Sequence, residues 1–170
     1  MSKLKLIFID IDGVLNNMDD ETSYFTYDPS KYTLSKTNID ALRKVLDQTG
    51  AKLVLSTSWR NHDKDYAFNY HGKLFKSPLK KFIEEIGKEH FYEHDSAPHL
   101  SGYQKYCDIL GFFYKYDLDI QNVKFAVLDD QMNQLLEKFG DSFFFIDGQH
   151  GLTSGIADSV IIHLNKEKRQ

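Results

Sequence analysis

Short apolar runs alternate along the chain with segments of helical periodicity. The first run, Leu4–Ile9, contains β-branched and aromatic residues and is interrupted only by Lys5. It predicts a buried strand that ends at Asp10. Four later runs predict further strands, namely "KLVLS" at 52–56, "HFYEH" at 90–94, "VKFAVLDD" at 123–130 and "FFFI" at 143–146.

Helical spacing marks most of the segments between these runs. Ser35 offers an N-cap, apolar residues follow at helical intervals, and Gly50 acts as a terminator, so a helix is predicted between them. Other helices are predicted around 62–70 and 78–87, at 103–113 and at 131–139, where Gly140 closes the last. This alternation predicts an α/β fold, a doubly wound three-layer sandwich around a mainly parallel sheet.

Two segments do not follow the pattern. Residues 16–34 are polar and aromatic and contain Pro29, which predicts an irregular loop or small hairpin lying as a flap over the first strand's tip. Residues 61–100 are rich in aromatic residues, His and Lys and are treated as an insertion of uncertain structure. Because no repeat or low-complexity segment separates the elements, a single domain is expected over 1–170.

Composition narrows the functional classes. The 170 residues carry a net charge of −4, and the clustered basic residues are confined to the tail around Lys166, Lys168 and Arg169. The chain as a whole is therefore not expected to attract nucleic acid or anionic lipid. The single cysteine, Cys107, excludes an intramolecular disulfide and a cysteine-built metal site. No apolar stretch is long enough for a membrane span, and we expect a cytoplasmic protein without an obligate protein partner.

Polar residues follow three of the predicted strands at their carboxyl ends, namely Asp10 and Asp12, then Ser56 and Thr57, then Asp129 and Asp130. If the strands are neighbours, these side chains meet at one edge of the sheet, where parallel sheets bind ligands. Two carboxylates about 4 Å apart repel by roughly 4 kcal/mol at an effective dielectric constant near 20. The cluster therefore predicts a hard cation, and Mg²⁺ shared with a phosphate fits best.

Three of these segments resemble motifs of the haloacid dehalogenase-like (HAD) phosphohydrolases. "DIDGVL" at 10–15 is similar to the first motif, "LVLSTS" at 53–58 to the second and "VLDD" at 127–130 to the fourth, in the family's order. Together with "STSWR" at 56–60 and "GLT" at 151–153, they look most like small HAD domains associated with RNA-repair proteins. The resemblance implies a HAD-like Rossmannoid fold with little or no cap and Mg²⁺-dependent phosphatase activity.

The resemblance also implies roles for the acidic residues. Asp10 would be the nucleophile that forms an aspartyl phosphate and a ligand of Mg²⁺, and Asp12 would protonate the leaving group and then activate water. The backbone carbonyl of Asp12 would complete the metal shell. Asp129 would hold Mg²⁺, and Asp130 would hold it through water or orient the third-motif lysine.

Other residues would bind the phosphoryl group or complete the third motif. Gly13 would allow the sharp turn that brings backbone groups to the phosphate, and Ser56, Thr57 and Arg60 would contact the phosphate. Lys105 is chosen as the third-motif lysine because it precedes an acidic–apolar pair at 108–109. The alternatives are Lys73, Lys76 and Lys80.

Simpler interpretations stand beside these. Asp-Gly after a strand is often just a turn, Asp129 and Asp130 suit a helix N-terminus, and Arg60 suits an ordinary ion pair. The spacing of His90, His94 and His99 is compatible with zinc, although an exposed polar segment is the simpler explanation. At the level of function, the alternatives are a metal-dependent nuclease or nucleotidyl-transfer domain and an inactive HAD-fold binding module.

The substrate is constrained by the lengths of the two insertions. Residues 16–34 are too few for a folded cap, and part of 61–100 is needed to complete the sheet. We therefore expect an open or thinly covered site that accepts a phosphate on a long molecule. The resemblance favours a nucleotide or polynucleotide end over a phosphoprotein.

Overall fold

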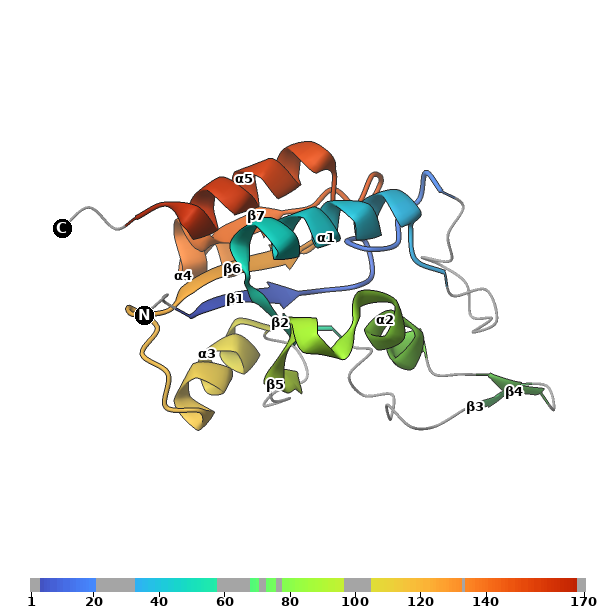
Figure 1. The fold of residues 1–170 in the computed structure, drawn as a ribbon, viewed down its shortest axis with the longest axis horizontal. Coiled ribbons are helices and arrows are strands. Elements are labelled where there is room, and N and C mark those ends of the chain that lie inside the picture. The colour runs from blue at the N-terminus through green and yellow to red at the C-terminus, as the bar shows by residue number, and fades with distance from the viewer. Residues whose placement is uncertain are drawn as a thin grey trace.

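The centre of the molecule is a five-stranded sheet in which all neighbouring strands are parallel (Figure 1). The computed structural model describes residues 4–20, 33–57, 68–70, 73–75, 78–96, 105–132 and 134–167. The strands lie in the order β5-β2-β1-β6-β7. Their bounds are Lys5–Ile9 for β1, Lys52–Leu55 for β2, Phe91–Ser96 for β5, Lys124–Asp129 for β6 and Phe143–Phe145 for β7. All five predicted strands are thereby confirmed.

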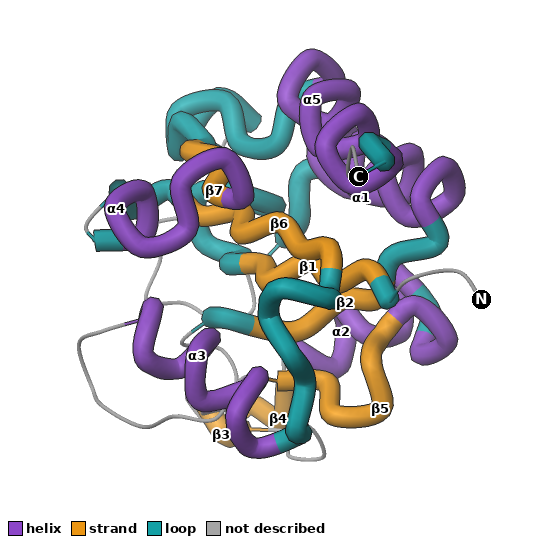
Figure 2. The backbone as a smooth tube through the Cα atoms, turned by 90° about the vertical axis from the view of Figure 1, so that its left-hand side faces the viewer, coloured by secondary structure: helices purple, strands orange, loops and turns teal. Residues whose placement is uncertain are grey.

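Helices cover both faces of the sheet and give the predicted three layers. Their bounds are Lys36–Thr49 for α1, Pro78–Ile86 for α2, Lys105–Lys115 for α3, Leu135–Phe139 for α4 and Ser154–Asn165 for α5. Figure 2 shows α1 and α5 on one side of the sheet and α3 and α4 on the other. Two short 3₁₀ turns, η3 at Lys88–His90 and η4 at Gly140–Ser142, precede β5 and β7. Within the described residues, no helix is long and apolar enough to cross a membrane.

The apolar runs explain why the strands are buried on both faces. Successive side chains of a strand point to opposite faces, and in β1 Ile7 and Ile9 pack with α1, α2 and α5 while Leu6 and Phe8 pack with α3 and α4. All four side chains are completely buried. The sheet is therefore a rigid platform, and its carboxyl edge is where polar side chains can be held in fixed positions.

The sequence signals at the ends of α1 are confirmed. The Ser35 hydroxyl accepts the Asn38 backbone N–H, which satisfies one of the free donors of the first turn. Gly50 ends the helix in the left-handed conformation, with φ of +64°. The helix predicted around 78–87 is also present as α2.

Two helix predictions need correction, and one helix was missed. Residues 68–70 of the predicted helix 62–70 instead form a strand, β3 (Phe68–Tyr70), which pairs antiparallel with β4 (Lys73–Phe75), while 62–67 lie outside the described residues. The helix predicted from 131 begins only at Leu135, because the Asp129 side chain accepts the Gln131 N–H and bends the chain there. Helix α5 was not predicted at all.

The insertion at 61–100 contributes much of its length to the sandwich itself. Leu79 and Phe82 of α2 are fully buried in the core, and β5 forms the sheet edge next to β2. The segment left for a cap is 58–77, of which the described part is the β3–β4 hairpin, lying beyond α2 and apart from the sheet (Figure 1). Of the predicted flap at 16–34, residues 18–20 form a turn and 21–32 lie outside the described residues.

Candidate active site

Three neighbouring strands bring their polar ends to one edge of the sheet. The chain runs from β1 through β2 to β5 on one side and then returns to β6 and β7 on the other, so the switch point lies between β1 and β6. The ladder continues past the strands, since Asp10 N–H donates to Leu128 O at 3.0 Å and Ser56 N–H to Ile9 O at 2.9 Å. Asp10 therefore lies between Ser56 and Asp129 at the switch point.

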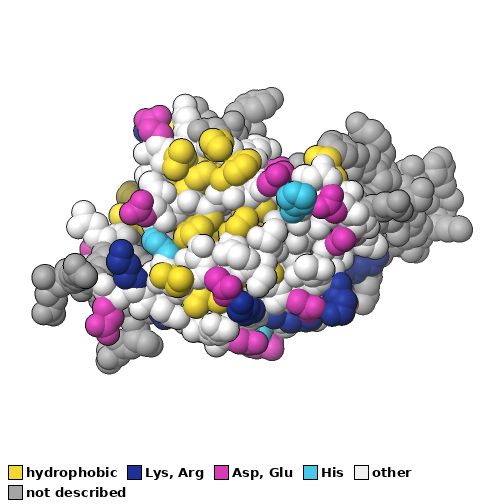
Figure 3. Space-filling model, turned by 90° about the horizontal axis from the view of Figure 1, so that it is seen from above, with side chains coloured by type: hydrophobic (Ala, Val, Ile, Leu, Met, Phe, Trp, Pro, Cys, Tyr) yellow, Lys and Arg dark blue, Asp and Glu magenta, His cyan; other side chains and the backbone are white. Residues whose placement is uncertain are grey.

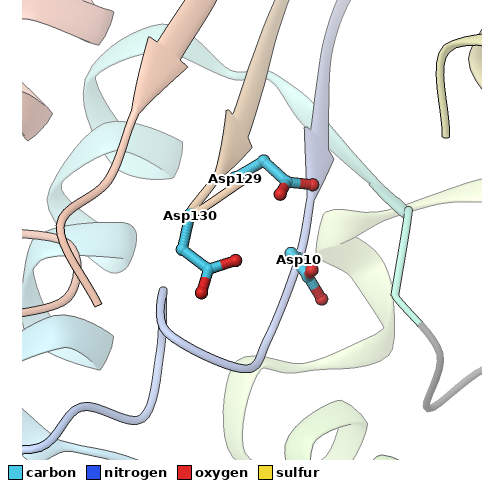
Figure 4. Close-up of side chains that lie close together, drawn as sticks. All are labelled: Asp10, Asp129 and Asp130. Atoms are coloured by element: carbon cyan, nitrogen blue, oxygen red, sulfur yellow. The ribbon is translucent and has the colours of Figure 1, made fainter. Parts of the chain in front are cut away.

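Three carboxylates converge there. Asp10 and Asp129 are buried, Asp130 is partly buried, and one oxygen from each lies within 4.8 Å of the others. Figure 4 shows the three side chains lying close together at the ends of β1 and β6. The Asp12 carboxylate lies outside this set, so a part for Asp12 in binding a cation would fall to its backbone carbonyl.

Lys105, the first residue of α3, links two of these carboxylates. Its ammonium group donates to Asp10 Oδ2 and to Asp129 Oδ2, the latter at 2.7 Å. The second oxygen of each carboxylate accepts a backbone N–H, from Ile11 at 2.7 Å and from Gln131 at 2.9 Å. Both side chains are thus held in one orientation from two directions.

The charges in the cluster do not balance without a further cation. Three ionised carboxylates and the Lys105 ammonium carry a net charge of −2. Oxygen ligands in a set of this charge suit a hard divalent cation. The residues present therefore fit a divalent metal.

Burial and mutual repulsion perturb two of the ionisable groups. Burial and, to a smaller extent, the charge of Asp10 raise the pKa of Asp129 from its usual 3.8 to about 7, against the opposing effects of Lys105 and the Gln131 N–H. Burial would lower the pKa of Lys105, but the charges of Asp10 and Asp129 outweigh burial and raise it. Lys105 therefore remains an ammonium ion, whereas Asp129 titrates near neutral pH.

Ser56 presents a hydroxyl group that the protein leaves unsatisfied. Within the described residues, its Oγ is the one buried side-chain oxygen or nitrogen without a hydrogen-bond partner, and the residue is 1% exposed. An unmade hydrogen bond of this kind costs about 1–3 kcal/mol. A ligand oxygen at this edge of the sheet would satisfy it. Thr57, the next residue, is also buried.

The turn after β1 brings Gly13 against the cluster. Gly13 has φ of +72°, and a Cβ atom built there would lie 2.9 Å or less from three side-chain atoms of Asp130. Only glycine fits both the conformation and the space. In the same turn, Asn16 is fully buried and donates to Asp12 Oδ1 at 2.9 Å. Reasoning from the sequence missed Asn16, whose one signal is the asparagine pair that directly follows "DIDGVL".

Several predicted residues fall where their side chains are not described. Arg60 and Lys76 lie outside the described residues, and so do the side chains of Lys73 and His94 and all of His99. Their predicted roles stay predictions. Lys80 lies partly exposed on α2, whereas Lys105 contacts the acidic cluster directly. The geometry therefore favours Lys105 among the described lysines.

A comparison with known families identifies the family of the chain. A family model described as "HAD domain in Swiss Army Knife RNA repair proteins" matches residues 6–157. The chain belongs to this family. The match starts in β1 and ends in α5, so it includes every residue of the acidic cluster. Membership of this HAD family confirms the resemblance seen in the sequence and indicates a phosphohydrolase-type function. No curated protein and no solved structure gave a significant match.

Proposed function

We propose that this HAD domain is a Mg²⁺-dependent phosphomonoester hydrolase that works through an aspartyl phosphate on Asp10. The observation that carries the proposal is the placement of the buried Asp10 carboxylate at the switch point, with the Lys105 ammonium on it and the unsatisfied Ser56 hydroxyl on the neighbouring strand. A fixed nucleophile beside hydrogen-bond donors for phosphoryl oxygens is what covalent phosphoryl transfer requires.

The reaction consists of two displacements at phosphorus. In the first, a carboxylate oxygen of Asp10 attacks phosphorus, the bond to the ester oxygen breaks, and Asp12 gives its proton to that oxygen, which releases an alcohol. In the second, Asp12 takes a proton from water while the water oxygen attacks phosphorus and the bond to Asp10 breaks. Inorganic phosphate leaves, and both aspartates return to their starting states.

The remaining side chains bind the transferring group. The Ser56 hydroxyl and the Lys105 ammonium donate to phosphoryl oxygens, and Gly13 keeps the turn close to the cluster. Thr57 and Arg60 are proposed to add contacts to the same phosphate. Asp10, Asp129 and Asp130, with the Asp12 carbonyl, would hold Mg²⁺, which when bound neutralises charge on the phosphoryl group as a Lewis acid.

For the substrate, we propose a phosphate at the end of a nucleotide or polynucleotide. The family description names RNA-repair proteins, and the small segment left for a cap suits a long substrate. Because the net charge of the chain is −4, a basic surface that binds the nucleic-acid backbone would have to be confined to one part of the molecule. On the face that carries α1 and α5, Lys and Arg side chains lie beside Asp and Glu (Figure 3), and the ion pairs join Lys36 with Asp40, Arg43 with Glu85 and Lys44 with Asp158. The lysines at 80 and 81 on α2 are better candidates.

The substrate assignment predicts a salt-dependent preference. At low salt, kcat/KM for a terminally phosphorylated oligonucleotide should exceed that for the matching mononucleotide by about tenfold or more, because backbone contacts release counterions. The advantage should shrink as salt rises. Replacing Lys80 and Lys81 with Gln should reduce it, whereas Lys44→Gln, on the charge-paired face, should not. Preference for the mononucleotide at every salt concentration would reject the polynucleotide assignment.

Metal binding should depend on pH through Asp129. Its pKa is raised to about 7 in the folded protein and is 3.8 ordinarily, so between these values the folded state binds more protons than the unfolded state. The metal-free protein should therefore lose stability from this group as pH rises from about 4 to 7. Mg²⁺ needs the ionised carboxylate, so its stabilising effect should grow over the same interval and level off above it.

Melting temperatures with and without millimolar Mg²⁺, measured from pH 5.5 to 8.5, test this linkage. Asp129→Asn should remove most of the Mg²⁺ effect at every pH and should melt higher than the parent without metal above pH 7, because one repelling charge is gone. Asp141→Asn, an exposed aspartate of η4, serves as the control. An Mg²⁺ effect of equal size at pH 5.5 and 8.5 would contradict the linkage to Asp129.

A further inference from the structure

Asn16 bridges two parts of the turn that follows β1. Its Oδ1 accepts the Gly13 backbone N–H at 2.8 Å, and its Nδ2 donates to Asp12 Oδ1 at 2.9 Å. The side chain is completely buried. The turn around it is closed by backbone bonds, since the N–H groups of Val14 and Leu15 both donate to Ile11 O, at 3.1 and 2.8 Å. The amide therefore has a fixed position between these two groups.

The direction of the amide follows from its partners. A backbone N–H can only donate, so the amide atom facing Gly13 must be the oxygen. The NH₂ group then has to face Asp12, and it too can only donate. Asp12 Oδ1 is accordingly used as an acceptor. When Asp12 is the neutral acid, this arrangement favours the proton on the other oxygen, Oδ2.

We propose that Asn16 is a positioning residue that holds the Asp12 carboxyl group so that Oδ2 carries the proton destined for the leaving group. The inference rests on the proposed phosphatase function and adds a residue to it. The Asp12 carboxylate is not one of the three carboxylates that could hold a metal ion. Gly13 is anchored to the same amide, so Asn16 also couples the acid to the turn that touches Asp130.

The proton transfers show why orientation matters. As the bond between phosphorus and the ester oxygen breaks, its electron pair stays on the ester oxygen, which takes the proton from Asp12 Oδ2. Asp12 is left as a carboxylate. In the second displacement, Oδ2 takes the proton of the attacking water, which restores the acid. Both transfers use the same oxygen, and a carboxyl group free to rotate would be misaligned for both.

Leaving groups of different basicity separate this role from a structural one. An alkoxide needs the proton as it leaves, whereas p-nitrophenolate leaves well without it. In Asn16→Ala and Asn16→Asp, kcat/KM for an alkyl phosphate should fall about tenfold or more beyond any fall for p-nitrophenyl phosphate, a part of the 10²- to 10⁴-fold that general acid catalysis supplies. Asn16→Asp keeps an acceptor for Gly13 but puts a second carboxyl group against Asp12 in place of the donor, so Asn16→Ala, which adds no charge, is the deciding variant. Calorimetric Mg²⁺ affinity and melting temperature report whether the site and the fold survive.

Two controls make the outcome decisive. Asn17 is buried like Asn16, but its amide donates to the Asn38 side chain and the His150 carbonyl, so Asn17→Ala should change kcat/KM for both esters by the same factor. Asp12→Asn should show the largest dependence on the leaving group. If Asp12→Asn shows that dependence and neither Asn16 variant does, the positioning role is wrong. If the kcat/KM of Asp12→Asn does not depend on the leaving group, the role of Asp12 as the acid in the proposed function is wrong, whatever the Asn16 variants show.

Discussion

Replacing Asp10 with asparagine is expected to lower phosphatase turnover by at least about 1,000-fold, because it removes the nucleophile of a covalent mechanism. The substitution keeps the size of the side chain, and its buried position at the end of β1 stays filled. It also removes a charge that repels Asp129. The metal-free variant should therefore melt at or above the temperature of the parent, which separates loss of chemistry from loss of fold.

Beryllium fluoride, which mimics an acyl phosphate on a carboxylate, provides the second measurement. It should form a stable adduct in the parent and in Asp12→Asn, and none in Asp10→Asn. The control is Asp19→Asn, in the same loop, whose carboxylate is half exposed and pairs with His150; this variant should keep near-parental turnover. Near-parental turnover in Asp10→Asn would exclude the aspartyl phosphate and favour direct attack of water between metal ions, as in a metal-dependent nuclease.

The sheet could be predicted because its strands are buried on both faces. Such strands read as continuous apolar runs, and each of the three that carry the site ends at a polar residue. Helix α1 could be predicted because Ser35 and Gly50 are residues typical of helix caps and mark both of its ends. For these elements the local sequence and the tertiary packing favour the same structure.

The errors arose where local signals were weak or ambiguous. The segment at 68–75 is aromatic and short, and an aromatic run of that length suits a hairpin as well as a helix. Helix α5 did carry signals, since Thr153 caps it and Ile156, Val160 and Leu164 recur at helical spacing. These signals directly follow the "GLT" segment at 151–153 and are sufficient to predict the helix.

The part of the site that could be predicted is the part whose position is fixed by the pairing of the strands. Asp10 follows the end of β1, Asp129 is the last residue of β6 and Asp130 follows it, and parallel neighbours bring such ends together. The direction of the Asp12 side chain depends on the turn at 12–16, which no periodicity describes. Its partner Asn16 could be found only once the turn was seen. Lys105 reaches the cluster from helix α3, and the sequence alone left it among four candidate lysines.

Removing the charge of Lys105 should affect both stability and catalysis. Lys105→Met leaves Asp10 and Asp129 buried without their shared ammonium partner, and breaking a buried ion pair from one side costs about 3–5 kcal/mol. Part of this loss is avoided when Asp129 is protonated and therefore uncharged, which happens readily because its pKa is raised to about 7. The loss in the free energy of unfolding should therefore be smaller at pH 6 than at pH 8. Mg²⁺ should restore part of it, because a divalent cation also neutralises the cluster.

Urea unfolding at pH 6 and pH 8, with and without Mg²⁺, measures these effects, and turnover in the folded variant should fall by about 100-fold or more because a donor to the phosphoryl group is lost. The matched control is Lys115→Met at the other end of α3, where the side chain is exposed and lies over the Tyr116 ring. Lys115→Met should lower the free energy of unfolding by at most about 1 kcal/mol, and this loss should not depend on Mg²⁺. Equal destabilisation of both variants, unaffected by pH and Mg²⁺, would mean that Lys105 acts as an ordinary surface lysine and that the acidic cluster is neutralised by other means.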